Sequence, residues 1–284
     1  MPDTGTYGLT LYAYDEDGFE HIVFPAEYVI NSQVCFFNYR ELPNKTYEYH
    51  LFLPNYDQVT SITLDIDDHA TIKFAKSFNE RPVLIYGTSI THGASPVHPA
   101  ISWANIVHRK IDHPVLNFGI MGFAMMEPEV ISYVLYSTEP IAVVFDCLPN
   151  ICIESLEIQV QKQVAAANQT RRYYPNVPIV FVDFGMYTDW EANQNNHDQT
   201  VRSHLAFEQA KAILEEMEMP NLYFVSHTEL NYSINDISDT VHPTEVGMAK
   251  HADKVAKPLL SILDNHNHEA TYTTQMSLSQ NRYE

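Results

Sequence analysis

The chain has 284 residues, of which 45% are hydrophobic and 18% are charged, so it can form one large domain or two unequal ones and is too apolar to be disordered. Its formal net charge of −20 repels phosphate backbones and anionic lipids, which excludes nucleic acid and membrane surfaces as partners. The N-terminus lacks the basic and apolar regions of a signal peptide, and no apolar run approaches the roughly 20 residues of a membrane-spanning helix.

Residues 1–78 are predicted to form a small antiparallel, jelly-roll-like β-sandwich domain. Short runs of aromatic and β-branched residues recur at a spacing of roughly ten residues, with turn-forming residues between them. The predicted strands cover residues 9–14, 21–24, 33–39, 47–53, 61–66 and 71–74. Residues 47–53 alternate well between the two faces of the chain, as a strand with one solvent-facing side should.

The pattern changes at residue 79, and up to residue 265 apolar strands alternate with longer helical segments. Such alternation predicts an α/β fold, with a parallel sheet covered by helices on both faces. The predicted strands are residues 83–86, 115–118, 142–145, 179–184 and 222–225. The predicted helices are residues 101–111, 128–136, 155–173, 201–219 and 244–263. Residues 266–284 form a polar C-terminal tail, which we expect to be loosely attached.

The turn at residues 87–93 carries the first candidate for chemistry. A glycine ends the apolar strand, and Ser89 follows two residues later on a short polar turn. Open α/β sheets place their ligand sites at the carboxyl ends of the strands. Ser89 is therefore the candidate nucleophile. A serine hydroxyl needs a base to remove its proton and a third group to orient that base.

The best candidate base lies between the last predicted strand and the last predicted helix. His242 follows Asp239 by three residues in one loop, so the carboxylate can fold back onto the imidazole. The loop belongs to the same edge of the sheet as Ser89. Most of the 14 histidines are expected on the surface, but the strand-edge position and the paired carboxylate favour His242 as a general base.

Acyl transfer also requires hydrogen-bond donors where an oxyanion forms. Gly122 follows the second strand, and its backbone amide can approach a ligand closely, although a glycine there also serves a turn. Asn150 follows the third strand, and its side-chain amide can donate, although asparagine in a loop is commonly a turn former. His92 and His98 lie near Ser89 in the chain and are secondary candidates for a base or a pocket lining.

Four strand ends thus offer, in order, a serine, a glycine, an asparagine and an Asp-x-x-His, and this arrangement resembles the SGNH branch of the GDSL esterase/lipase family. The block at Ser89 reads Gly-Thr-Ser-Ile-Thr, and the block at Asn150 reads Asp-Cys-Leu-Pro-Asn. Both are similar to those of a subgroup that carries a β-sandwich segment ahead of the hydrolase domain. The resemblance covers residues 80–264 well and the sandwich segment more loosely.

The resemblance implies a role for each matching residue. Ser89 would be the nucleophile, His242 the general base and Asp239 its orienter. The Ser89 amide, the Gly122 amide and the Asn150 side chain would form the oxyanion hole. The implied fold is a flavodoxin-like three-layer α/β/α hydrolase domain over residues 79–265, and the family uses no metal and no organic cofactor.

Two blocks depart from the family pattern. Thr88 stands where the family's name-motif has an aspartate, so we expect its hydroxyl to steady the loop in place of a carboxylate. Thr240 and Val241 lie between the acid and the base, where relatives often have a glycine. Both departures bear on how the site is held together.

We expect a serine esterase that removes short acyl groups, acetyl first among them, from carbohydrate. The carbohydrate preference comes from the sandwich segment and from the 18 tyrosines and the many asparagines, which suit stacking on sugars and bonding to their hydroxyls. One alternative is a lipase or thioesterase acting on longer acyl chains. Another is a non-catalytic carbohydrate-binding or structural protein on the same scaffold.

The expected partner is a small-molecule or polysaccharide ester. The N-terminal domain and the tail are the candidate surfaces for a homo-oligomer or for assembly into a particle. Without a visible signal peptide, the cytoplasm is the default compartment. Release by lysis, or a particle-borne location, would bring the protein to a polysaccharide.

Overall fold

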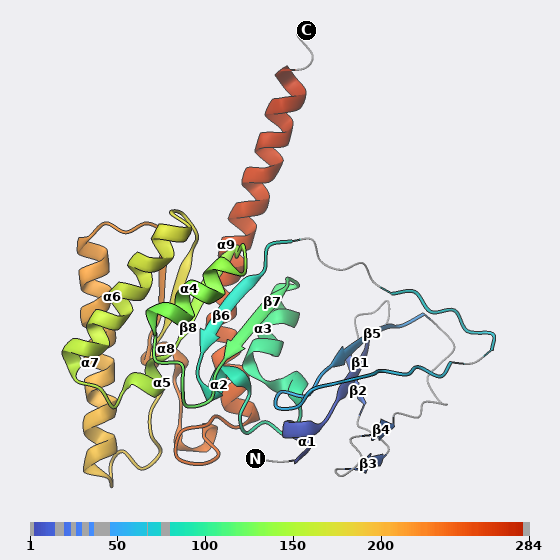
Figure 1. Ribbon diagram of the computed structural model, residues 1–284, viewed down its shortest axis with the longest axis horizontal. Helices are drawn as coiled ribbons and strands as arrows, with labels where there is room; N and C mark the ends of the chain where they lie inside the picture. The colour runs from blue at the N-terminus through green and yellow to red at the C-terminus, as the bar shows by residue number, and fades with distance from the viewer. Residues whose placement is uncertain are drawn as a thin grey trace.

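A computed structural model of the chain describes residues 3–14, 20–23, 27–29, 34–36, 46–66, 68–74 and 80–280. Its largest unit is a 5-stranded parallel sheet between helices, which confirms the predicted α/β class (Figure 1). The strands are β6 (Val83–Gly87), β7 (Val115–Gly119), β8 (Ala142–Asp146), β9 (Ile179–Val182) and β10 (Leu222–Val225). Their order, β10-β9-β8-β6-β7, is that of a flavodoxin-like doubly wound sheet.

The parallel strands form where the sequence predicted them because most are covered on both faces. Every residue of β6, β8 and β9 is buried, which explains their continuous apolar runs. Strand β7 lies at the edge of the sheet and has exposed positions. Gly87 at the end of β6 pairs with Gly119 of β7 and Asp146 of β8. The carboxyl ends of these three strands therefore meet at one edge of the sheet.

Two apolar cores, one on each face of the sheet, hold three layers together. The covering helices are α3 (Trp103–Ile111), α4 (Pro128–Tyr136), α6 (Leu156–Tyr173), α7 (Gln194–Glu216) and α9 (Glu245–Gln280). Helices α3 and α9 cover one face and contribute Trp103 and Leu259 to its core. Helices α4, α6 and α7 cover the other face, with Ile131 and Phe207 in that core (Figure 1). Alternate residues of β6 enter the two cores, as the geometry of a strand requires.

The N-terminal segment forms two small antiparallel sheets after a short helix, α1 (Asp3–Tyr7). One sheet has the order β2-β1-β5, and the other pairs β3 with β4. These strands are β1 (Thr10–Tyr14), β2 (Glu20–Val23), β3 (Glu27–Val29), β4 (Val34–Phe36) and β5 (Glu48–Phe52). Four of them confirm strands that the sequence predicted, although residues 24, 33 and 37–39 of those predictions lie outside the described residues. The expected β-sandwich also falls partly on residues that are not described.

The strands predicted over residues 61–66 and 71–74 were wrong. In the structure neither of these two segments is part of a strand or a helix. Their large apolar side chains are exposed, Ile62 at 54% and Phe74 at 81%. An alternating pattern stabilises a strand only where one face is buried, and here neither face is.

Several helix boundaries also differ from the predicted ones. Helix α3 follows a short turn, η1 (Pro99–Ile101), and α7 begins at Gln194 because the Asn193 side chain caps it. Helix α9 continues to Gln280 instead of ending at residue 263, because the chain after Pro258 contains neither glycine nor proline. The C-terminal end of α9 projects away from the sheet (Figure 1). The short elements α2 (Ser89–His92), α5 (Leu148–Ile151), α8 (His227–Leu230) and η2 (Ile234–Asp236) were not predicted. No helix in the described part of the chain is long and apolar enough to cross a membrane.

The N-terminal segment packs against the α/β unit beside residues 87–93, the turn that carries the candidate nucleophile Ser89 and is hereafter the nucleophile turn. The guanidinium of Arg109 on α3 lies over the rings of Tyr12 and Phe52, 4.8 Å and 5.2 Å from their centres. The Asn55 side chain donates a hydrogen bond to Gly93 O at 3.3 Å. The segment that follows β5 therefore contacts the end of the turn that carries Ser89.

Candidate active site

Ser89 lies on a tight turn between β6 and α2. The Thr88 hydroxyl caps this helix by accepting a backbone N–H at 3.2 Å, so a hydroxyl does steady the turn, as the sequence led us to expect. Gly93 ends the helix with a φ of 98°, which favours glycine. Gly87 is needed for close packing, because a Cβ there would lie 2.0 Å from the Thr91 hydroxyl. The turn holds the Ser89 side chain at the carboxyl edge of the sheet.

Ser89, His242 and Asp239 form a hydrogen-bonded chain. Ser89 Oγ lies 2.8 Å from His242 Nε2, and His242 Nδ1 lies 2.7 Å from Asp239 Oδ2. Burial alone would raise the pKa of Asp239, but the backbone amides of His242 and Val241, each donating to Oδ1 at 2.8 Å, hold it below its ordinary value of 3.8. An ionised carboxylate only accepts hydrogen bonds, so Nδ1 carries the proton and Nε2 accepts from the serine.

The loop that carries the histidine is held from both sides. The Ser238 hydroxyl donates to Ser95 Oγ at 2.8 Å, which joins the loop to the segment after the nucleophile turn. The Thr188 backbone N–H donates to Thr240 O at 3.0 Å. Val241 packs against both apolar cores. Thr240 and Val241, the two residues between Asp239 and His242, therefore anchor the loop.

The two further predicted oxyanion donors lie on the turns after β7 and β8. The Ile120 N–H donates to Gly87 O at 2.8 Å, which holds the turn carrying Gly122 against the nucleophile turn. Gly122 has a φ of 76°, and a Cβ built on it would meet nothing within 4 Å, so its backbone borders open space. Asn150 lies on α5, and its amide Nδ2 is buried without an acceptor among the described residues. A buried donor left unpaired costs free energy, and a bound oxygen atom would satisfy it.

His92, at the end of α2, and His98 both contact the N-terminal segment. The His92 ring stacks on Tyr56 of the N-terminal segment, with ring centres 4.0 Å apart. His98 is buried, its Nδ1 lies 3.2 Å from Thr10 Oγ1, and burial together with the Arg109 charge lowers its pKa to about 4. Both histidines therefore connect the N-terminal segment to the α/β unit.

A second group of ionisable side chains, which the sequence did not single out, lies at the ends of β9 and β10. Asp183, His204 and His227 bring potential metal-ligand atoms within 4.8 Å of one another. The carboxylate accepts from His227 Nδ1 at 2.7 Å, and His204 Nε2 donates to the carbonyl oxygens of Phe184 and Gly185 at 2.9 Å and 3.1 Å.

The geometry of this group suits a structural brace better than a metal site. The two imidazole rings are stacked 3.5 Å apart with their planes 4° from parallel, and one nitrogen of each ring is already hydrogen-bonded within the protein. The hydrogen bonds join the segment that follows β9 to α7 and α8. The three residues lie far apart in the sequence and form no motif. The one signal in the sequence that could have pointed to this group was Asp183, near the end of the strand predicted at residues 179–184.

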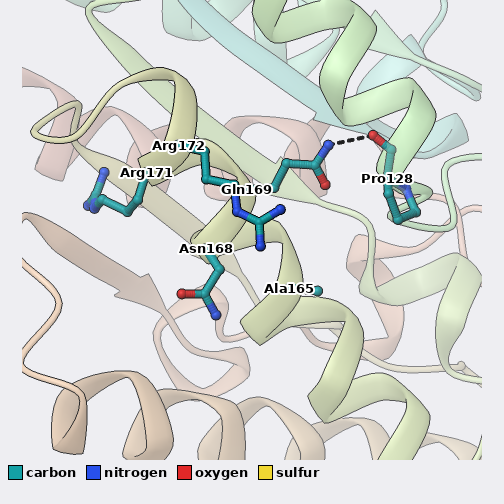
Figure 2. A pocket seen from close by; sticks show the side chains of 6 residues that line it. All are labelled: Pro128, Ala165, Asn168, Gln169, Arg171 and Arg172. Atoms are coloured by element: carbon teal, nitrogen blue, oxygen red, sulfur yellow. Dashed lines mark hydrogen bonds between the residues drawn. The ribbon is translucent and has the colours of Figure 1, made fainter.

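A shallow hollow between α4 and α6 is shown in Figure 2. Its lining residues are Pro128, Ala165, Asn168, Gln169, Arg171 and Arg172. Gln169 donates to Pro128 O at 2.6 Å, and Arg171 donates to the backbone oxygens of Val177 and Pro220. These polar groups are occupied in joining α6 to neighbouring segments. The carboxyl edge of the sheet is therefore the better candidate for an active site.

The family of the chain follows from comparison with family models. Residues 80–260 match the model of the GDSL-like lipase/acylhydrolase family, and residues 1–72 match that of the N-terminus of SGNH-hydro-type esterases. The chain belongs to the GDSL-like lipase/acylhydrolase family. This confirms the resemblance seen in the sequence, and membership of an acylhydrolase family makes the chain an ester-hydrolysing enzyme. No curated protein matches this GDSL-like chain.

Solved structures share the fold of this GDSL-like enzyme. A GDSL-like lipase from Bacteroides ovatus ATCC 8483 is 23% identical with a TM-score of 0.77, over 92% of this chain and 76% of the other. A carbohydrate esterase family 2 enzyme with a carbohydrate-binding domain, from Corynascus thermopiles (Myceliophthora fergusii), is 14% identical with a TM-score of 0.61, over 90% and 87%. A family two carbohydrate esterase from Clostridium thermocellum, in complex with cellohexaose, is 13% identical with a TM-score of 0.55, over 90% and 86%.

Proposed function

We propose that this enzyme is a serine esterase that removes short acyl groups, chiefly acetyl, from carbohydrate. Ser89 is the nucleophile, His242 the general base and Asp239 the group that orients the base. One observation carries the proposal: the serine hydroxyl lies 2.8 Å from the imidazole, whose other nitrogen lies 2.7 Å from the carboxylate. A nucleophile, a base and an orienter in this sequence of contacts activate a hydroxyl for attack.

The proposed roles imply the following steps of the reaction. His242 Nε2 takes the hydroxyl proton as Ser89 Oγ bonds to the ester carbonyl carbon, and the carbonyl oxygen becomes an oxyanion. The backbone amides of Ser89 and Gly122 and the Asn150 side chain donate hydrogen bonds to it. The imidazolium then protonates the departing alcohol oxygen, and an acyl-serine remains. His242 next deprotonates a water molecule, which attacks the acyl carbon; the bond from that carbon to Ser89 Oγ then breaks, the imidazolium returns its proton to Oγ, and the acid leaves.

Two observations support a carbohydrate ester as the substrate. The Corynascus and Clostridium structures are both of carbohydrate esterases, and the latter contains cellohexaose. Phe123, which follows Gly122 on the proposed oxyanion turn, is 73% exposed. An exposed aromatic ring at this position offers a face on which a sugar can stack.

Acetate released from acetylated oligosaccharides tests the substrate class. We expect the wild type to release acetate and Ser89→Ala to release it at a rate lower by roughly 10⁴-fold or more. Chromogenic esters from acetyl to palmitoyl, assayed in parallel, should give the highest kcat/KM at acetyl. A maximum at palmitoyl would contradict the proposal and favour the lipase or thioesterase alternative, because a long acyl chain gains binding energy only in an apolar groove.

Removal of the Asn150 amide tests the oxyanion hole. We expect Asn150→Ala to lower kcat by roughly 100- to 1,000-fold, since one donor to the developing oxyanion is lost, while KM changes little. Steady-state kinetics on the acetyl ester give both constants. Asn168→Ala, on α6 in the hollow of Figure 2, is the matched control and should retain full activity. An Asn150→Ala enzyme that is as fast as the wild type would remove Asn150 from the oxyanion hole.

A further inference from the structure

A buried carboxylate, Asp146, lies beside the nucleophile turn and has no role in the steps above. It ends β8 and pairs with Gly87, the last residue of β6, in the register of the parallel sheet. Its exposed fraction is 0%. Burying a carboxylate is costly unless its contacts compensate. The contacts of Asp146 therefore indicate why a carboxylate stands at this position.

Two hydrogen bonds join Asp146 to the nucleophile turn. The Thr91 hydroxyl donates to Asp146 Oδ2 at 2.6 Å, and the Thr88 backbone N–H donates to Asp146 O at 3.2 Å. These two threonines flank Ser89 in the chain. Gly87 makes the approach possible, because a Cβ there would lie 2.0 Å from Thr91 Oγ1 and 2.9 Å from Asp146 O. The direction of the Ser89 side chain therefore depends on a residue of the neighbouring strand.

The same residue begins the turn that carries Asn150. Cys147 follows Asp146, and the Asn150 backbone N–H donates to Cys147 O at 3.1 Å. The Cys147 thiol donates to Tyr86 O at 3.4 Å, which is a second connection between this turn and β6. The proposed nucleophile and one proposed oxyanion donor are thus both held from the end of β8.

The contacts of Asp146 do not offset the free-energy cost of burying its carboxylate, so stability of the fold does not explain the residue. Its Oδ1 has no hydrogen-bond partner in the described part of the chain, and burial raises its pKa to about 7, although the Thr91 bond acts the other way. His251 of α9 faces it, with Nε2 3.9 Å from Asp146 Oδ2 and equally unpartnered among the described residues. The other nitrogen of His251 lies 2.8 Å from the Tyr232 hydroxyl. A costly polar group beside a reactive serine indicates a functional constraint.

We propose that Asp146 is a positioning residue of the esterase site, which acts through Thr91 to fix the turn that carries Ser89. This inference rests on the proposed function, because it takes Ser89 as the nucleophile. The carboxylate holds the Thr91 side chain in one rotamer, so α2 keeps Ser89 Oγ at 2.8 Å from His242 Nε2. Without that bond the serine leaves its attack geometry, while the surface that binds substrate stays the same. The loss therefore falls on kcat and not on KM.

Two substitutions at Thr91 test the inference. Thr91→Val removes the hydroxyl at nearly constant volume, and we expect kcat on a chromogenic acetyl ester to fall roughly 10- to 100-fold with KM unchanged. Thr91→Ser keeps the hydroxyl and should restore kcat to near the wild-type value. Thr170→Val is the matched control, since this buried threonine of α6 donates to Ala166 O at 2.8 Å and should leave kcat unchanged.

A double-mutant cycle separates the proposed contact from general destabilisation. Asp146→Ala should lower kcat by about the same factor as Thr91→Val, and the double variant should be no slower than either, because one hydrogen bond is lost in all three. If Asp146→Ala does not fold, as thermal unfolding will show, the two Thr91 variants and their control decide alone. A Thr91→Val enzyme with wild-type kcat, or losses that multiply in the double variant, would overturn the inference.

Assays of the wild-type enzyme distinguish a failure of this inference from a failure of the proposed function. If the wild type neither hydrolyses acetyl esters nor forms a phosphonate adduct on Ser89, both proposals fail together. If it does both and Thr91→Val is unaffected, only the positioning role of Asp146 fails.

Discussion

Ser89→Ala is expected to lower kcat on a chromogenic acetyl ester by roughly 10⁴-fold or more, with an unchanged melting temperature. The variant cannot form an acyl-serine, and His242 with the oxyanion donors can only assist a direct attack by water. The serine hydroxyl contacts an imidazole at the edge of the sheet, so its removal leaves the apolar cores intact. Initial rates and thermal unfolding of the two proteins measure both effects.

A serine-reactive phosphonate provides a second readout of the same residue. It should add one covalent group to wild-type Ser89 and none to Ser89→Ala, as seen by mass spectrometry. Ser137→Ala, at the end of α4, is the matched control and should keep both activity and labelling. Hydrolysis at the wild-type rate in Ser89→Ala would rule out Ser89 as the nucleophile. A wild type that is neither labelled nor active would favour a non-catalytic binding or structural protein on this scaffold.

His242→Asn is expected to have an effect of similar size, roughly 10⁴- to 10⁶-fold on kcat, because asparagine cannot take the serine proton. Asp239→Asn should cost less, since the carboxylate acts through the imidazole. The pKa of Asp239 lies below its ordinary value of 3.8, because backbone amides outweigh its burial. Asp239 therefore stays ionised at neutral and mildly acidic pH, and it should not set the acid limb of the kcat/KM profile.

The control for the second prediction is a histidine outside the site. His197 on α7 stacks on Trp190 with ring centres 5.2 Å apart, and His197→Asn should keep wild-type kinetics. Measured pH profiles of kcat/KM for both variants complete the test. A His242→Asn enzyme within tenfold of the wild type would mean that another group is the base.

The α/β unit could be predicted because its signals are local. Residues 222–225 and 128–136 form β10 and α4 at the predicted boundaries, since buried runs and helical periods are readable in a short window. The pattern at 61–66 looked equally strand-like but is irregular, because a strand also needs a neighbour and a buried face. The neighbouring strand and the buried face both depend on the rest of the chain. The end of α9 was missed for a different reason, since a polar composition does not stop a helix that lacks glycine and proline.

The residues of the candidate site that follow the ends of predicted strands could be predicted from the sequence. Ser89, Asp239 and His242 were expected together, and the structure brings them within hydrogen-bond distance. The contact between Thr91 and Asp146 joins residues 55 positions apart, so it depends on which strands are neighbours. At position 88 the sequence led us to expect a hydroxyl in place of the aspartate, but it did not indicate a contact from Asp146. The turn is held by a threonine cap together with a carboxylate from the next strand.

The Asp146–His251 pair has a consequence for the stability of the fold across the acid range. Burial raises the pKa of Asp146 from 3.8 to about 7 and lowers that of His251 from 6.5 to about 3. Between pH 3.8 and 6.5 the folded state keeps a proton on Asp146 that the unfolded chain releases, so rising pH destabilises the fold through this group. Over the same range the unfolded chain binds a proton on His251 that the folded state lacks, so rising pH stabilises the fold through that group. The two slopes oppose each other over this range, so the buried pair beside the turn that carries Ser89 partly balances its own effect of pH on stability.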